Sequence, residues 1–156
     1  MDGPAVARGR GERLEPVAPA VADRLRGTRI LLAKPFFGVS TPWAFAALAR
    51  LDHGWTPEEK AERRLAEWSA DGKSGWGTLL HNDFEPAVFG KHIALEVMKR
   101  ELTDTFGCPV LMSGSGSTLF AVLAPGQEEA PVRERILRAY GPKALVRTAM
   151  ITTDVA

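Results

Sequence analysis

The segment best suited to chemistry is residues 112–118, with the sequence MSGSGST. Its glycines can adopt positive φ angles and let a ligand approach the backbone. Successive amides in such a loop can hold phosphate oxygens, and its hydroxyl groups add donors. This segment itself contains no Gly-Lys-Ser/Thr, and no helix is expected to follow it, so it is neither a P-loop nor a dinucleotide fingerprint. Taken alone, an ordinary Gly/Ser turn is the commoner interpretation and an anion-binding loop is the alternative.

Two further segments place polar groups where a ligand could meet them. Residues 34–43 (KPFFGVSTPW) pass from an expected strand to a helix start, whose free amides, with Ser40 and Thr41, could meet an anion. An ordinary helix cap with aromatic packing also explains them and is favoured when they are taken alone. In residues 81–89 (HNDFEPAVF), two carboxylates near a histidine raise the hypothesis that Asp83 and Glu85 form a general acid/base pair. Side chains two positions apart do not share a helix face, so a cap at Asn82 or Asp83 is favoured.

Composition excludes several classes of protein. Net charge is +1 with no basic cluster, which argues against nucleic acid as a partner. A single cysteine, Cys108, and three scattered histidines predict neither a disulfide nor a metal site. No apolar run is near the roughly 20 residues of a membrane span, and the start has no secretory signal. We therefore expect a soluble, cytoplasmic protein with no membrane partner.

The elements that must position these segments follow from hydrophobic spacing. Strands are predicted at residues 29–33, 110–112, 118–123 and 144–151, and the second and third should pair as a hairpin-like unit. Helices are predicted after Thr41-Pro42, after a capping box at Thr56–Glu59, and along two apolar stripes at residues 95–106 and 132–140. A strand within residues 6–12 would have no evident partner. Helices clustered between strands predict an α+β domain with an antiparallel sheet.

Four segments in order resemble the GHMP family of small-molecule kinases. They are residues 9–16 (GRGERLEP), 34–45 (KPFFGVSTPWAF), 82–86 (NDFEP) and 112–120 (MSGSGSTLF), the last resembling the third family motif. The resemblance implies a ferredoxin-like α+β domain, with a four-stranded antiparallel sheet packed with helices. It also implies a small-molecule substrate, with ATP and Mg²⁺ as cofactors of the parent enzyme. The most similar members phosphorylate a hydroxyl of cytidyl-diphospho-methylerythritol in the non-mevalonate isoprenoid pathway.

By this resemblance, specific residues acquire expected roles. The phosphate-binding loop would comprise Ser113, Gly114, Ser115, Gly116, Ser117 and Thr118, although Ser117 stands where many members have proline. Thr41 and Pro42 fall where the family contacts its substrate. No residue of this chain matches a catalytic or metal-binding position of the family.

The resemblance also covers only part of a family kinase. The family's N-terminal half carries a lysine-bearing motif, a Gly/Ser-rich ATP loop and a catalytic aspartate, and none of them is found in this sequence. We therefore expect residues 1–27 to be a remnant of the N-terminal kinase domain with its linker, and residues 28–156 to be the C-terminal domain. The chain alone should be inactive and should need the missing half. The alternative is a non-catalytic ferredoxin-like module for binding or self-association, for instance as a homodimer.

Overall fold

The architecture comes from a computed structural model, which describes residues 5–8, 13–52, 54–70 and 75–152. The strands are β1 (Ala5–Arg8), β2 (Arg13–Pro16), β3 (Arg29–Lys34), β4 (Val110–Met112), β5 (Leu119–Leu123) and β6 (Leu145–Met150). The helices are α1 (Pro19–Leu25), α2 (Thr41–Leu48), α3 (Glu58–Ala70), α4 (Trp76–Leu79), α5 (Phe84–Lys91), α6 (Ile93–Phe106) and α7 (Glu129–Tyr140). All four predicted strands are therefore confirmed, to within about two residues.

Strands β3 to β6 form one antiparallel sheet in the order β4-β5-β3-β6. When these four are numbered along the chain and the sheet is read from β6, the order is 4-1-3-2, that of a ferredoxin-like sheet. The expected hairpin of β4 and β5 is present, with Val110 opposite Ala121 and Met112 opposite Leu119. The predicted α+β class with a four-stranded antiparallel sheet is thus confirmed.

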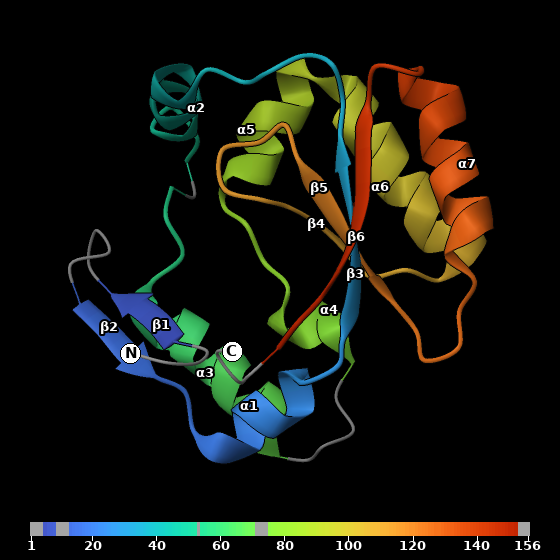
Figure 1. The fold of residues 1–156 in the computed structure, drawn as a ribbon. Coiled ribbons are helices and arrows are strands. Elements are labelled where there is room, and N and C mark those ends of the chain that lie inside the picture. The colour runs from blue at the N-terminus through green and yellow to red at the C-terminus, as the bar shows by residue number, and fades with distance from the viewer. Residues whose placement is uncertain (1–4, 9–12, 53, 71–74, 153–156) are drawn as a thin grey trace.

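The core lies between this sheet and helices α6 and α7, which run beside it in Figure 1. The apolar stripes predicted for both helices are buried as expected. The fully buried members of these stripes are Leu95, Met98, Leu102, Val132 and Ile136. Helix α6 ends where Gly107 adopts a φ of 65°, a left-handed conformation that stops the helix.

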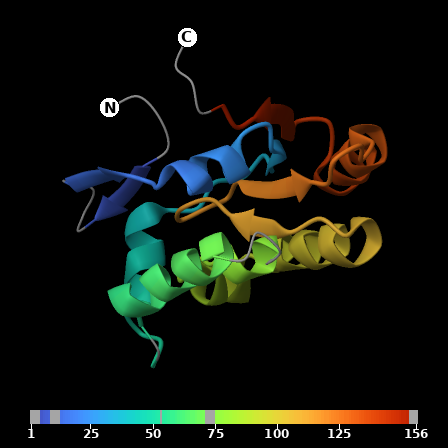
Figure 2. The ribbon, with the colours of Figure 1, turned by 90° about the horizontal axis from the view of Figure 1, so that it is seen from below.

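The first segment of the chain departs from expectation. Strand β1 has a partner after all, because it pairs with β2 in a separate two-stranded antiparallel sheet, with Ala5 opposite Pro16. A hairpin of the chain with itself satisfies the backbone groups that were expected to lack a partner. Figures 1 and 2 show this hairpin apart from the four-stranded sheet. The GRGE motif at residues 9–12 lies outside the described residues.

The capping box predicted at residues 56–59 is also wrong. Helix α3 begins at Glu58, and the carbonyl of Pro57 accepts from the amides of Lys60 and Ala61. The Thr56 hydroxyl instead donates to Asp83, which is distant in sequence.

In the described ranges, no helix has the length and apolar character to cross a membrane.

Candidate functional site

Loop 113–118 joins β4 to β5 and folds back on itself. The Ser113 amide donates to the Thr118 carbonyl at 2.8 Å, and the Gly116 amide donates to the Ser113 carbonyl at 3.0 Å. Gly114 and Gly116 have φ angles of 54° and 88°, which glycine adopts without steric cost. Within the described part of the chain, the amides of Gly114 and Ser115 have no such acceptor. These two amides can therefore meet an anion.

Two hydrogen bonds bring this loop against the segment before α2. The hydroxyl groups of Thr41 and Ser115 are 2.8 Å apart, although 74 residues separate them in the sequence. The Ser117 hydroxyl donates to the Phe37 carbonyl at 2.6 Å, and Ser117 is only 1% exposed. The two segments that the sequence singled out thus form one surface. Of the predicted loop residues, Ser117 uses its hydroxyl to hold the loop in place.

The start of α2 completes that surface. The Ser40 side chain accepts from the Trp43 amide at 3.4 Å, so Ser40 is the helix cap. Pro42 lies in the first turn, where its missing N–H costs nothing. The first turn of a helix carries a partial positive charge, so Thr41 and the loop face a region that favours anions.

Asn82 fastens the loop from a third segment. Its side-chain nitrogen donates to the Met112 carbonyl at 2.6 Å and to the Gly114 carbonyl at 2.8 Å. Its side-chain oxygen accepts from the Phe84 amide at 2.9 Å, at the first residue of α5, while the N-cap position itself is Asp83. One amide side chain therefore couples the start of α5 to the shape of the loop.

The carboxylates of this segment point to different partners, so they form no general acid/base pair. Glu85 accepts from the Met112 amide at 2.8 Å and from the Lys99 ammonium at 2.5 Å. Asp83 accepts from the Thr56 hydroxyl at 2.5 Å and from the Thr56 amide at 3.0 Å. The interpretation favoured from the sequence, in which these two carboxylates do not form a catalytic pair, therefore agrees with the structure.

His81, Asp83 and Thr56 form a polar cluster beside the loop. The His81 Nε2 atom lies 2.7 Å from the Thr56 hydroxyl and 2.8 Å from an Asp83 oxygen. Burial alone would raise the pKa of Asp83. The hydrogen bonds from Thr56 and His81, together with the charge of His81, outweigh burial and hold that pKa below its ordinary value. Asp83 is therefore a carboxylate at neutral pH.

A cavity of about 580 Å³ connects this cluster to the loop. Its lining includes Ser113 and Gly114, the cluster of His81 and Asp83, and Arg64 of α3. The Arg64 Nε atom is buried and, within the described ranges, has no hydrogen-bond partner. A cavity with a Gly/Ser loop, a carboxylate and a cation at its wall is suited to a polar ligand. Sequence reasoning missed Arg64, because no motif marks it.

In the described ranges, no three His, Cys, Asp or Glu side chains lie close enough together to hold a metal ion. Cys108 is buried, and burial raises the pKa of its thiol, against a hydrogen bond from Gln127. It is thus a packed thiol and not a thiolate ligand.

Comparison with known proteins points to one kind of enzyme. No protein-family model matches the chain. It is 34% identical over 146 residues to a 4-diphosphocytidyl-2-C-methyl-D-erythritol kinase of Nitratidesulfovibrio vulgaris, covering 88% of this chain and 46% of the relative. A kinase of the same name from Synechococcus sp. is 32% identical over 146 residues, covering 88% and 45%. One from Bacteroides fragilis is 30% identical over 125 residues, covering 80% and 41%.

Solved structures agree. A crystal structure of 4-(cytidine 5'-diphospho)-2C-methyl-D-erythritol kinase matches with a TM-score of 0.67 and 27% identity, covering 94% of this chain and 50% of that one. A homoserine kinase from Cytophaga hutchinsonii matches with a TM-score of 0.66 at 15% identity, covering 98% and 49%, which supports the fold alone. The resemblance inferred from four motifs is confirmed. The chain spans about half the length of the curated relatives that it matches.

Proposed function

We propose that this chain, a homologue of 4-diphosphocytidyl-2-C-methyl-D-erythritol kinases over most of its length, provides the substrate- and phosphate-side half of an ATP-dependent kinase of that kind. The acceptor would be a hydroxyl group of the cytidyl-diphospho-methylerythritol substrate. The single observation that carries the proposal is the contact between Thr41 and Ser115, which joins the two family-like segments into one surface.

The roles of individual residues follow from the geometry. The free amides of Gly114 and Ser115 and the hydroxyls of Ser113 and Ser115 would hold phosphate oxygens. Thr41, and Pro42 beside it in the first turn of α2, would contact the substrate. Ser117 would act indirectly, by fixing the loop to Phe37.

ATP would supply the transferred phosphoryl group, and Mg²⁺ would offset the charge on the phosphates. The loop amides suit the phosphates. The carboxylates beside the loop are already engaged by Thr56 and Lys99, so Mg²⁺ would be held chiefly by ATP and by residues other than these.

Phosphoryl transfer needs a phosphate cradle, a metal ion and a positioned nucleophile together. The residues described here provide part of the cradle, so this chain alone should be inactive.

The proposed division is a first region of residues 1–27, which contains the separate β1–β2 sheet, and a kinase C-terminal domain of residues 28–156. The alternative of a non-catalytic module is not favoured, because the homologues are kinases.

Binding at the loop tests this proposal. The chain, labelled with ¹⁵N, would be titrated with ATP, the cytidyl-diphospho substrate and inorganic phosphate, and amide signals would be followed. We expect saturable shifts at Gly114 and Ser115. A Thr41→Val variant should weaken binding of the substrate, while Thr103→Val, an exposed change on α6, should not. Equal affinity in wild type and Thr41→Val would refute the assignment.

A further inference from the structure

A second cavity, of about 550 Å³, lies at the opposite end of the sheet from loop 113–118. It is lined by Thr28 and Leu123, at the start of β3 and the end of β5, whereas the loop precedes the first residue of β5. Four residue steps of about 3.3 Å place roughly 13 Å of strand between the two regions. None of the residues assigned above to the kinase site lines this cavity.

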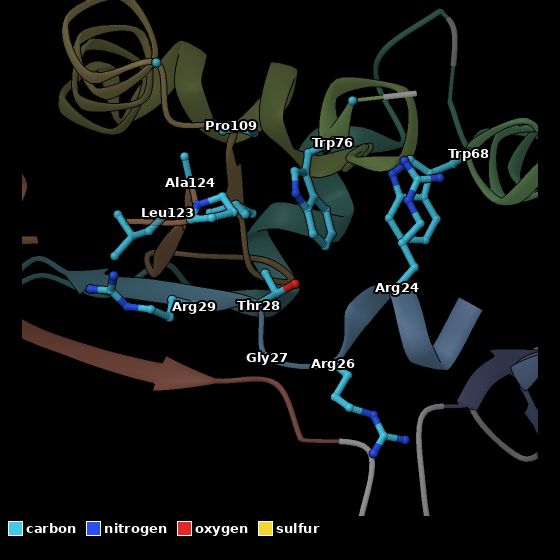
Figure 3. A pocket seen from close by; sticks show the side chains of 14 residues that line it. Arg24, Arg26, Gly27, Thr28, Arg29, Trp68, Trp76, Pro109, Leu123 and Ala124 are labelled. Atoms are coloured by element: carbon cyan, nitrogen blue, oxygen red, sulfur yellow. The ribbon is translucent and has the colours of Figure 1, made fainter. Parts of the chain in front are cut away.

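One wall of the cavity is aromatic. The ring centroids of Trp68 and Trp76 are 5.3 Å apart, and the guanidinium of Arg24 stacks over Trp68 at 3.9 Å from the ring centroid. In Figure 3, Trp76 lies between the stacked Trp68 and Arg24 on one side and Leu123, at the end of β5, on the other. Flat apolar walls of this kind favour a planar ligand.

The same wall contains a polar group that lacks an acceptor. Trp68 is only 1% exposed, and its indole Nε1 is buried. In the part of the chain that the structure describes, this N–H has no hydrogen-bond partner. Buried donors are almost always paired, so this N–H is available to an acceptor that enters the cavity. A ligand that enters the cavity with an oxygen atom can supply it.

The charged side chains of the cavity lining are arginines. Among the described residues, the lining includes Arg24, Arg26 and Arg29 but no aspartate or glutamate. Arg26 and Arg29 lie at the rim and also contact carboxylates outside the lining, at 3.4 Å and 3.5 Å. Arg24 is the cation that lies against the aromatic wall, as Figure 3 shows. A negative ligand is therefore favoured over a neutral or positive one.

We propose that this cavity is a second ligand site, which binds a small aromatic anion such as an aryl phosphate or aryl carboxylate. The ring packs against Trp76, an acidic oxygen accepts from Trp68 Nε1, and the charge lies near Arg24. The site is independent of the proposed kinase function, because the two regions share no residue.

The indole N–H signals of the four tryptophans test the proposal directly. The probe is 1-naphthyl phosphate, with inorganic phosphate and 1-naphthol as its two halves, and the Trp68 signal is assigned with Trp68→Phe. We expect the Trp68 and Trp76 signals to shift and saturate, while Trp43 stays in place. Either half alone should bind at least about tenfold more weakly. A Trp68 signal that stays in place at saturating probe would overturn the proposal.

Variants separate this site from weak surface binding. Ala124→Phe fills the cavity from an exposed lining position, and Arg24→Gln removes the charge beside the indole. Each should weaken probe binding about tenfold. Arg138→Gln removes an exposed arginine on α7 and should leave binding unchanged. Equal affinity across wild type, Ala124→Phe and Arg24→Gln would mean that the probe binds elsewhere, against the proposal.

Discussion

Asn82 should be one of the most sensitive positions of this chain, because one side chain makes three hydrogen bonds at the junction of α5 and the loop. Asn82→Ala removes both bonds to the carbonyls of Met112 and Gly114 and the acceptor of the Phe84 amide at the start of α5. A typical intramolecular hydrogen bond contributes about 0.5–1.5 kcal/mol to stability. Loss of all three should therefore lower the free energy of unfolding by about 3 kcal/mol.

Asn82→Asp is the sharper perturbation, because it keeps the acceptor for the Phe84 amide but replaces the donor. A carboxylate oxygen would then face two carbonyl oxygens from the positions that are now 2.6 Å and 2.8 Å away. At pH 7 the loss should equal or exceed that of Asn82→Ala. At pH 3 the introduced carboxyl group is largely protonated and regains one donor, so the deficit relative to wild type should shrink.

Urea unfolding of the two variants at both pH values measures these effects, with loop binding of phosphate as a second readout. Asp104→Asn, a charge change at an exposed position of α6, is the control and should alter stability by less than about 0.5 kcal/mol. If Asn82→Asp were as stable as this control at pH 7, the described junction would not contribute to the fold and the reasoning would fail.

Two further predictions concern the loop and the polar cluster beside it. Gly116→Ala should destabilise the chain by about 2 kcal/mol or more, since φ is 88° and the new Cβ would lie 2.8 Å from the Met112 sulfur. Gly114→Ala, with φ of 54° and open space, should lose only about 1 kcal/mol in the same urea titration, and equal losses would contradict this. The pKa of Asp83 is lowered in the folded state. Its contribution to the free energy of unfolding is therefore fully present above its unfolded pKa and is lost as the pH falls through its folded pKa. Asp83→Asn should therefore flatten the loss of unfolding free energy below about pH 4, measured by urea unfolding at several pH values.

Most of the sheet and helices α6 and α7 could be predicted, because their signals are local. The buried residues of α6 and α7 recur at helical spacing, and Gly107 ends α6 through its own backbone preference. Strand β4 was predicted with its observed bounds, since Pro109 and the glycine-rich loop limit it on both sides. Local chemistry was sufficient for these elements.

The errors and omissions have a common cause in long-range contacts. Thr56 matched a capping box in sequence, but Asp83 lies 27 residues away and offers a stronger, charged acceptor. The link from Asn82 to the loop spans 30 residues or more, and no spacing rule reports such a contact. The cavity of Trp68 and Arg24 likewise joins α1 to α3, which have no shared motif.

The central claim is that this chain supplies one half of a kinase site. Its most direct test is a turnover assay with ATP, Mg²⁺ and the cytidyl-diphospho-methylerythritol substrate. The chain is assayed alone, and then with the remaining half of the Nitratidesulfovibrio vulgaris relative. We predict no turnover by the chain alone, and turnover with the added half that Gly116→Ala abolishes. Turnover by the chain alone, or turnover of the mixture that Gly116→Ala leaves unchanged, would contradict the account.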